Sequence, residues 1–184
     1  MVDCDVVVIG LGAMGSAALH RLALRGQRVM GLEQFTPGHD RGSSHGETRI
    51  IRLGYFEHPS YVPLLHETYR LWREVEAASN TALLTVTGII EFGGPDSALV
   101  AGTLASSRQH ALPHEVITAA ELMRRFPPFR LPSDFIGVWQ PDGGFLLGGF
   151  AEFYVCAPPL RCAIEDMTLL PFLGRLHGKS TAPR

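Results

Sequence analysis

A glycine-rich turn and a later acid have the residue types and spacing that bind a dinucleotide. Gly10, Gly12 and Gly15 follow the pattern GxGxxG, and Glu33 lies about 20 residues further on, as this motif requires. The first glycine suits a tight turn out of a strand, the second lets a pyrophosphate approach the backbone, and the third allows close helix packing. Because an acid at Glu33 would bind ribose hydroxyls and disfavour a 2′-phosphate, the motif predicts FAD or NAD rather than NADP.

A second polar stretch, residues 42–52, carries groups suited to proton transfer and carboxylate recognition. Arg49 and Arg52 are three residues apart, and on a helical turn they would share a face. Two guanidiniums held in this way suit a substrate carboxylate or the electron-rich edge of a reduced flavin. The His45 imidazole can accept or donate a proton, and Tyr55 adds a hydroxyl. On these residues alone, an exposed basic turn with a surface histidine is the simpler alternative.

The elements that must position these groups follow from the apolar pattern. The continuous β-branched run at residues 6–9 suits a parallel strand covered on both faces. Residues 16–25 predict an amphipathic helix that ends at Gly26, and residues 28–33 predict a second strand. This order of strand, turn, helix and strand is the one a dinucleotide-binding βαβ unit needs.

Further elements are predicted after this unit. Residues 34–47 are polar and rich in turn-forming residues, which indicates a functional loop. A short helix or turn is expected over residues 48–53. Ser60 and a Thr118 capping box are typical helix starts. Helices are expected at 60–78, 96–111 and 118–126, and strands at 114–117 and 135–140. Residues 83–87 and 89–92 are expected to form two strands that flank Gly88, or one bent strand.

Composition limits the class of protein. The 184 residues are 46% hydrophobic and 18% charged, which is typical of a globular chain. A net charge of −2 provides no basic surface for nucleic acid, and no apolar run approaches the roughly 18 residues of a membrane span. The three cysteines lack disulfide or zinc spacing and fit reduced thiols. We therefore expect a cytoplasmic protein with no metal site and no nucleic-acid or membrane partner.

These motifs together resemble the sarcosine oxidase and N-methyltryptophan oxidase group of the D-amino-acid-oxidase-like FAD oxidoreductases. The resemblance covers residues 2–147 and is most specific at His45-Gly46-Glu47-Thr48-Arg49-Ile50-Ile51-Arg52. Residues 61–64 and 140–146 also agree. The fold implied is an incomplete α/β fold, in which a Rossmann-like FAD-binding βαβ unit is joined to part of a mixed-sheet substrate domain.

The resemblance also implies a reaction and the residues that serve it. A secondary amine with a carboxylate, such as an N-methyl amino acid, would be oxidised to an imine while O2 is reduced to H2O2. The residues implied to hold the ADP half of FAD are Gly10, Gly12, Ala13, Met14, Gly15, Glu33 and Gln34. Those implied to lie near the flavin are Ser43, Ser44, His45, Thr48 and Arg49. Arg52 would pair with the substrate carboxylate and Tyr55 would line the pocket, so that His45, Arg49, Arg52 and Tyr55 form the catalytic set.

The resemblance stops after residue 147. Residues 1–147 are therefore interpreted as the N-terminal part of an FAD-dependent oxidoreductase domain, and residues 148–184 as an unrelated or frameshifted tail that is poorly ordered. Cys156 and Cys162 are not taken as a flavin-linking cysteine. We expect a truncated form that binds FAD weakly and does not turn over. An NAD-dependent dehydrogenase and a non-catalytic adenine-nucleotide-binding module are the alternatives.

Overall fold

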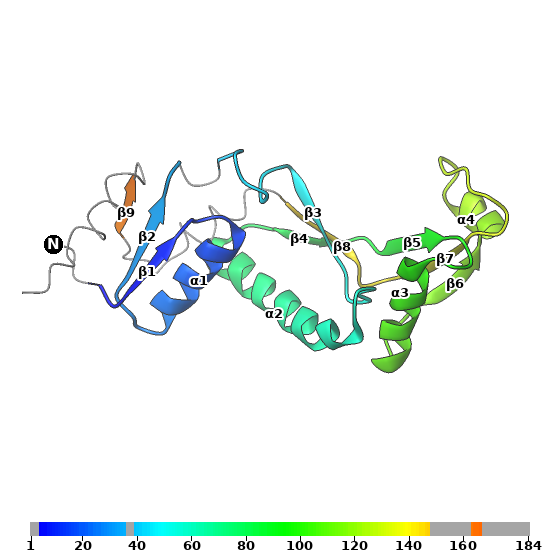
Figure 1. Ribbon diagram of the computed structural model, residues 1–184, viewed down its shortest axis with the longest axis horizontal. Coiled ribbons are helices and arrows are strands. Elements are labelled where there is room, and N and C mark those ends of the chain that lie inside the picture. The colour runs from blue at the N-terminus through cyan, green and yellow to red at the C-terminus, as the bar shows by residue number, and fades with distance from the viewer. Residues whose placement is uncertain (1–3, 36–38, 148–162, 167–184) are drawn as a thin grey trace, which may run out of the picture. The chain divides into compact units, whose positions relative to one another are not determined.

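The computed structural model describes residues 4–35, 39–147 and 163–166 (Figure 1). The chain divides into two units, of which the first comprises residues 1–47 and 148–184 and the second residues 48–147. The expectation that residues 148–184 are an unrelated and poorly ordered tail falls on residues outside the described part, apart from 163–166. No helix in the described ranges has the length and apolar character needed to cross a bilayer.

The first unit contains the predicted βαβ arrangement. Strands β1 (Val6–Ile9) and β2 (Val29–Glu33) pair in parallel, from Val6 opposite Val29 to Ile9 opposite Leu32, and helix α1 (Ala13–Leu24) connects them. Strand β9 (Ala163–Asp166) pairs in parallel with the other side of β2, which gives the sheet order β1-β2-β9. The prediction of strand, helix and strand is confirmed, although the helix begins three residues earlier than expected.

The core of this unit lies between α1 and one face of the sheet. Leu11, Leu19 and Val29 form a buried cluster, against which Val6 and Val8 of β1 pack. Since side chains alternate along a strand, the other face of β1 carries Val7 and Ile9, which are 42% and 59% exposed. Within the described residues, α1 covers one face of β1 and the apolar side chains on the other face are exposed.

The second unit contains two antiparallel sheets. The first has the order β3-β8-β4, built from Thr48–Ile51, Gly144–Leu147 and Leu84–Val86. The second has the order β5-β7-β6, built from Ile89–Gly93, Ile136–Gln140 and Glu115–Thr118. The predicted strands are confirmed in type, and β8 is an additional strand. The positive φ of Gly88, +80°, lets the chain turn from β4 into β5.

Three α-helices and one 3₁₀ turn complete this unit. They are η1 (Pro59–Tyr61), α2 (Val62–Ser79), α3 (Ala98–Gln109) and α4 (Ala119–Arg125). Trp72 and Val75 of α2 are buried and form its core face, whereas Tyr61, just before the helix, is 46% exposed. The predicted cap at Ser60 is wrong, because Ser60 lies within η1 and donates its backbone N–H to His58 instead.

The predicted helix or turn over residues 48–53 is also wrong. Residues Thr48–Ile51 form β3, which pairs antiparallel with β8 from Thr48 opposite Leu147 to Ile51 opposite Gly144. The β-branched residues Thr48, Ile50 and Ile51 suit a strand. Because the pairing partner lies nearly a hundred residues later in the sequence, the local pattern did not reveal it.

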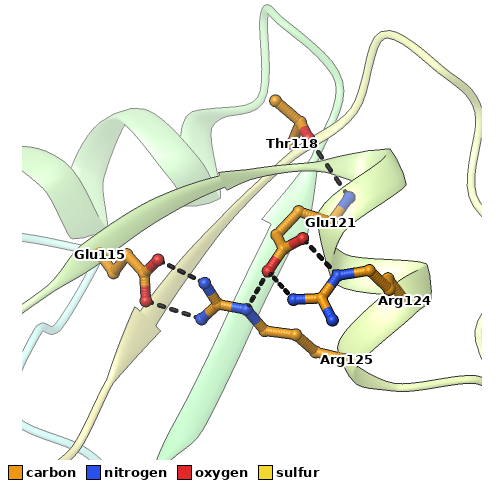
Figure 2. Close-up of polar contacts among 5 residues, drawn as sticks. All are labelled: Glu115, Thr118, Glu121, Arg124 and Arg125. Atoms are coloured by element: carbon orange, nitrogen blue, oxygen red, sulfur yellow. Dashed lines mark hydrogen bonds and ion pairs between the residues drawn. The ribbon is translucent and has the colours of Figure 1, made fainter.

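Helix α4 is attached to β6 by a surface network that Figure 2 shows in detail. Thr118 Oγ1 accepts the Glu121 backbone N–H at 3.3 Å, as predicted for the cap. The Glu121 carboxylate accepts hydrogen bonds from Arg124 and Arg125, which lower its pKa to about 2. Arg125 also binds Glu115 of β6 through both terminal nitrogens, at 2.7 and 2.6 Å. Arg125 therefore links the helix to the strand that precedes it.

Candidate functional site

The glycine turn in the first unit brings the end of β1 into close contact with α1. Gly10 has φ +85° and donates its N–H to Leu32 of β2 at 2.7 Å. A Cβ at Gly15 would lie 1.8 Å from the Gly10 carbonyl oxygen. Only glycine fits such a backbone approach without a shift of the helix. The geometry therefore explains why residues 10 and 15 are glycines, independently of any ligand.

Gly12 leaves space at the start of α1. It is the N-cap residue of the helix, and a Cβ placed there would meet, among the described residues, only Ser44 Oγ at 3.5 Å. The Ser44 hydroxyl accepts the Ala13 backbone N–H at 3.1 Å. A helix N-terminus with small residues suits an anion, and the Ser44 hydroxyl, which accepts the Ala13 N–H, can still donate its own O–H to one. This part of the turn fits a pyrophosphate, and the exposed Met14 follows it.

The Glu33 carboxylate lies directly against this turn. It is buried, its Oε2 accepts the Leu11 backbone N–H at 2.6 Å, and its Oε1 accepts the N–H groups of Gln34 and Phe35 at 2.7 and 3.2 Å. Burial alone would raise the pKa of Glu33, but these three backbone hydrogen bonds and the nearby His39 outweigh it, so that the pKa is lowered. Glu33 is thus held as a carboxylate beside the glycine turn.

The loop after β2 carries the other predicted cofactor residues. Ser43, His45 and Thr48 are exposed, and the His45 ring donates from Nδ1 to the Gly42 carbonyl oxygen. That Ser43, His45 and Thr48 lie near a bound flavin stays a prediction.

The sequence reasoning missed a small cluster in the same loop. The rings of Phe35 and His39 lie 4.9 Å apart, edge to face, and the Arg41 guanidinium lies 4.8 Å from the Phe35 ring centroid. His39 Nε2 lies 3.4 Å from Glu33 Oε1. The sequence signal that could have identified this cluster is the occurrence of Phe35, His39 and Arg41 within seven residues directly after Glu33 and Gln34.

Arg52, in the second unit, lies among carboxylates and aromatic rings. Its Nε is 3.1 Å from Glu91 Oε1, and its Nη2 is 3.5 Å from Glu57 Oε2. Its Cζ lies 4.7 Å from the Tyr55 ring centroid and 5.5 Å from that of Phe56. The side chain is only 18% exposed. Arg52 is therefore a partly buried, oriented cation, and the Tyr55 ring lies against it.

Arg49 is placed differently from Arg52. It lies on β3 and donates from Nη1 to the Thr48 carbonyl oxygen at 2.7 Å. Along an extended chain, an odd separation places two side chains on opposite faces. The expectation that Arg49 and Arg52 share a helical face is therefore wrong, because residues 48–51 form a strand.

Glu91 is a residue of the Arg52 surroundings that the sequence reasoning missed. It lies on β5 and is 7% exposed. The signal was an acid inside the apolar run Ile89-Ile90-Glu91-Phe92, because a carboxylate is rarely buried without a partner.

A parallel βαβ unit with a glycine turn and a buried acid, joined to antiparallel sheets, defines a dinucleotide-binding oxidoreductase of mixed α/β fold. The chain belongs to the DAO family of FAD dependent oxidoreductases, whose family model matches residues 5–148. FAD is the cofactor of this family. The choice between FAD and NAD, which the turn leaves open, is thereby made at the level of the family.

Individual relatives agree with this assignment. The chain is 50% identical over 142 residues to monomeric sarcosine oxidase of Streptomyces avermitilis, covering 77% of this chain and 37% of that protein. It is 37% identical over 142 residues to N-methyl-L-tryptophan oxidase of Salmonella arizonae, covering 77% and 38%. Among solved structures, NikD, an amino acid oxidase of nikkomycin biosynthesis, matches with a TM-score of 0.77 at 33% identity, covering 88% of this chain and 42% of that one. The chain thus spans well under half the length of these relatives.

Proposed function

We propose that the chain provides the FAD-binding part and a carboxylate-binding arginine of an oxidase for N-methyl amino acids or similar secondary amines, with O2 as the electron acceptor. The observation that carries this proposal is the buried Glu33 carboxylate bonded to the Leu11 amide of the glycine turn. The 50% identity to a sarcosine oxidase supports the substrate class. A cytoplasmic location and the absence of nucleic-acid and membrane partners belong to the same proposal.

In this proposal the first unit holds the ADP half of FAD. Gly12 lets the pyrophosphate reach the start of α1, next to Ala13 and Met14, while Gly10 and Gly15 form the turn that brings the helix there. Glu33 and the adjoining Gln34 take the ribose. A carboxylate offers about four lone-pair sites, and three of them already accept backbone N–H groups. One site on Oε2 is left for a ribose hydroxyl.

Residues of the loop and of the second unit serve the reacting groups. Ser43, Ser44 and Thr48 contribute hydroxyls toward the flavin, and Arg49 contributes a positive charge. His45 accepts or donates the proton that the amine exchanges. When bound, FAD supplies the two-electron oxidation and the reaction with O2. These assignments follow the family pattern position by position.

Arg52 and Tyr55 are assigned to the substrate. A guanidinium has five N–H donors. Arg52 forms ion pairs with Glu91 at Nε and with Glu57 at Nη2, and among the described residues Nε has no hydrogen-bond acceptor. Other donors on the guanidinium are then available to a substrate carboxylate. The Tyr55 ring covers one side of the Arg52 guanidinium and excludes water from it.

The experiment is a binding and reduction assay on the full chain with FAD. We expect FAD to bind more tightly than NAD, as measured by calorimetry, and Glu33→Gln to weaken FAD binding. Bleaching of the oxidised flavin under anaerobic conditions with sarcosine, but not with dimethylamine, which lacks the carboxylate, would support the oxidase and overturn the expectation from the sequence that this chain does not turn over. Tighter binding of NAD would contradict the cofactor assignment. FAD binding without any amine-dependent bleaching would contradict the oxidase and favour a non-catalytic nucleotide-binding module.

A further inference from the structure

Glu91 is a buried acid whose position needs an explanation. It lies in the middle of β5, opposite Val138 of β7, and is 7% exposed. Its Oε1 lies 3.1 Å from Arg52 Nε. A carboxylate removed from water is strongly disfavoured unless it is paired. Glu91 and Arg52 therefore hold each other in place, and neither could move far without leaving a poorly solvated charge.

The other oxygen of Glu91 is also fixed. Thr103 of α3 is fully buried and donates from Oγ1 to Glu91 Oε2 at 2.8 Å. Burial raises the pKa of Glu91 above its ordinary value, and the Thr103 hydrogen bond and the charge of Arg52 offset this only in part, while the charge of Glu57 adds to it. With one oxygen bonded to Thr103 and the other facing Arg52, the carboxylate has a single orientation.

Helix α3 also holds the backbone that follows Arg52. The Ser106 hydroxyl donates to the Tyr55 carbonyl oxygen, and a Cβ at Gly102 would lie 2.0 Å from the Phe56 carbonyl oxygen. Gly102, Thr103 and Ser106 lie on one face of the helix, since residues three and four apart are neighbours there. One helix face therefore fixes both the backbone after Arg52 and, through Glu91, its guanidinium.

A second acid near Arg52 is less able to fix it. Glu57 Oε2 lies 3.5 Å from Nη2, and the Glu57 side chain is 41% exposed. An exposed carboxylate keeps much of its hydration and gains little from a pair. The buried Glu91 is therefore the partner that determines the direction of the guanidinium.

We propose that Glu91, oriented by Thr103, is a positioning residue that aims the Arg52 guanidinium at a substrate carboxylate. The inference rests on the proposed function, because it takes Arg52 as the carboxylate-binding group. Glu91 itself touches neither substrate nor cofactor and acts only through Arg52.

The test uses the full chain with FAD and the variants Glu91→Gln, Thr103→Val and Thr103→Ser. The ¹H–¹⁵N NMR signal of Arg52 Nε–H reports the position of the guanidinium, and a sarcosine titration reports its use. We expect Glu91→Gln to shift that signal, speed its exchange with water and weaken sarcosine binding about tenfold or more. Thr103→Val should act in the same direction to a smaller extent, and Thr103→Ser should restore both readouts.

Glu76→Gln is the matched control, because the Glu76 carboxylate is also partly buried and bonded, but to the Leu83 and Leu84 amides rather than to Arg52. It should lower the melting temperature and leave the Arg52 signal unchanged. If Glu91→Gln does not fold, the comparison of Thr103→Val with Thr103→Ser decides. An unchanged signal and unchanged sarcosine affinity in Thr103→Val and in any folded Glu91→Gln would overturn the inference.

Arg52→Lys separates this inference from the proposed function. If the unaltered chain binds sarcosine and Arg52→Lys binds it equally well, then Arg52 is not the carboxylate-binding group and the proposed function fails. If Arg52→Lys loses binding while Glu91→Gln and Thr103→Val keep it, only the positioning role fails. If the unaltered chain does not bind sarcosine, both are overturned.

Discussion

The backbone N–H of Leu11 donates to the Glu33 carboxylate at 2.6 Å, across 22 residues of sequence. This hydrogen bond joins the glycine turn after β1 to the end of β2. Both partners are buried, with Leu11 2% and Glu33 7% exposed. The part of the chain that would hold a dinucleotide is therefore already organised by its own hydrogen bonds.

Replacement of this carboxylate should lower the stability of the first unit. The two Glu33 oxygens accept hydrogen bonds from three backbone N–H groups. In Glu33→Gln, an NH2 group that cannot accept a hydrogen bond replaces one oxygen, so at least one buried N–H loses its partner. We expect a loss of about 1–3 kcal/mol in the free energy of unfolding, measured by urea denaturation. Glu47→Gln, at an exposed position, is the control and should change it by less than about 0.5 kcal/mol. Equal losses in both variants would contradict the role of Glu33.

The same carboxylate predicts how stability depends on pH. Folding lowers the pKa of Glu33 below its ordinary value of 4.5. Its ionisation therefore contributes stability that is fully present above that pH and is lost as the pH falls through the folded value. The difference in unfolding free energy between the unaltered chain and Glu33→Gln should shrink in that acid range. A difference that stays constant from about pH 7 to about pH 3 would show that the pKa is not lowered.

Gly15 and Gly12 should respond differently to the same substitution. Gly15→Ala places a methyl group 1.8 Å from the Gly10 carbonyl oxygen, so α1 must move and the unit should lose at least roughly 2 kcal/mol of stability. Gly12→Ala meets only the Ser44 hydroxyl, at 3.5 Å, and should fold nearly as well. In calorimetry, Gly12→Ala should nevertheless bind FAD more weakly, because its methyl group faces the phosphate approach. Similar melting temperatures for the two variants would refute this distinction.

Tyr69 of α2 offers a test in the second unit. Its hydroxyl donates to the Asp142 carbonyl oxygen and the ring packs against the buried cluster of Leu53, Val62 and Leu112. Burial, followed by the charge of Asp142, raises the pKa of Tyr69 to about 12. Tyr69→Phe should therefore lower the unfolding free energy by about 1 kcal/mol. In a spectrophotometric titration, one tyrosine should ionise near pH 12, and it should be missing from the variant.

The parts of the fold that could be predicted are those encoded by local sequence. The βαβ unit follows from three glycines and an apolar helix face within residues 6–33, and its acid is where the motif places it. Strand β3 could not be predicted in this way, because its hydrogen bonds go to β8, far along the chain. The conformation of residues 48–53 therefore depends on tertiary pairing, which no local window contains.

The candidate site likewise has a part that could be predicted from the sequence and a part that could not. Arg52 and Tyr55 could be proposed as site residues from the family resemblance, and their side chains lie together. Arg52 contacts Glu91, which is 39 positions later in the sequence, and Glu91 is in turn bonded to Thr103 of the helix that follows β5. A buried acid in an apolar strand indicates only that some partner exists. The identity of that partner required the three-dimensional structure.

The pairing of Thr48 with Leu147 has a topological consequence. The chain enters the second unit along β3 and leaves it along β8, and these strands lie side by side. The second unit, residues 48–147, therefore has its first and last residues next to each other. Insertions or deletions inside it can alter its own loops without changing the separation that the flanking segments must bridge.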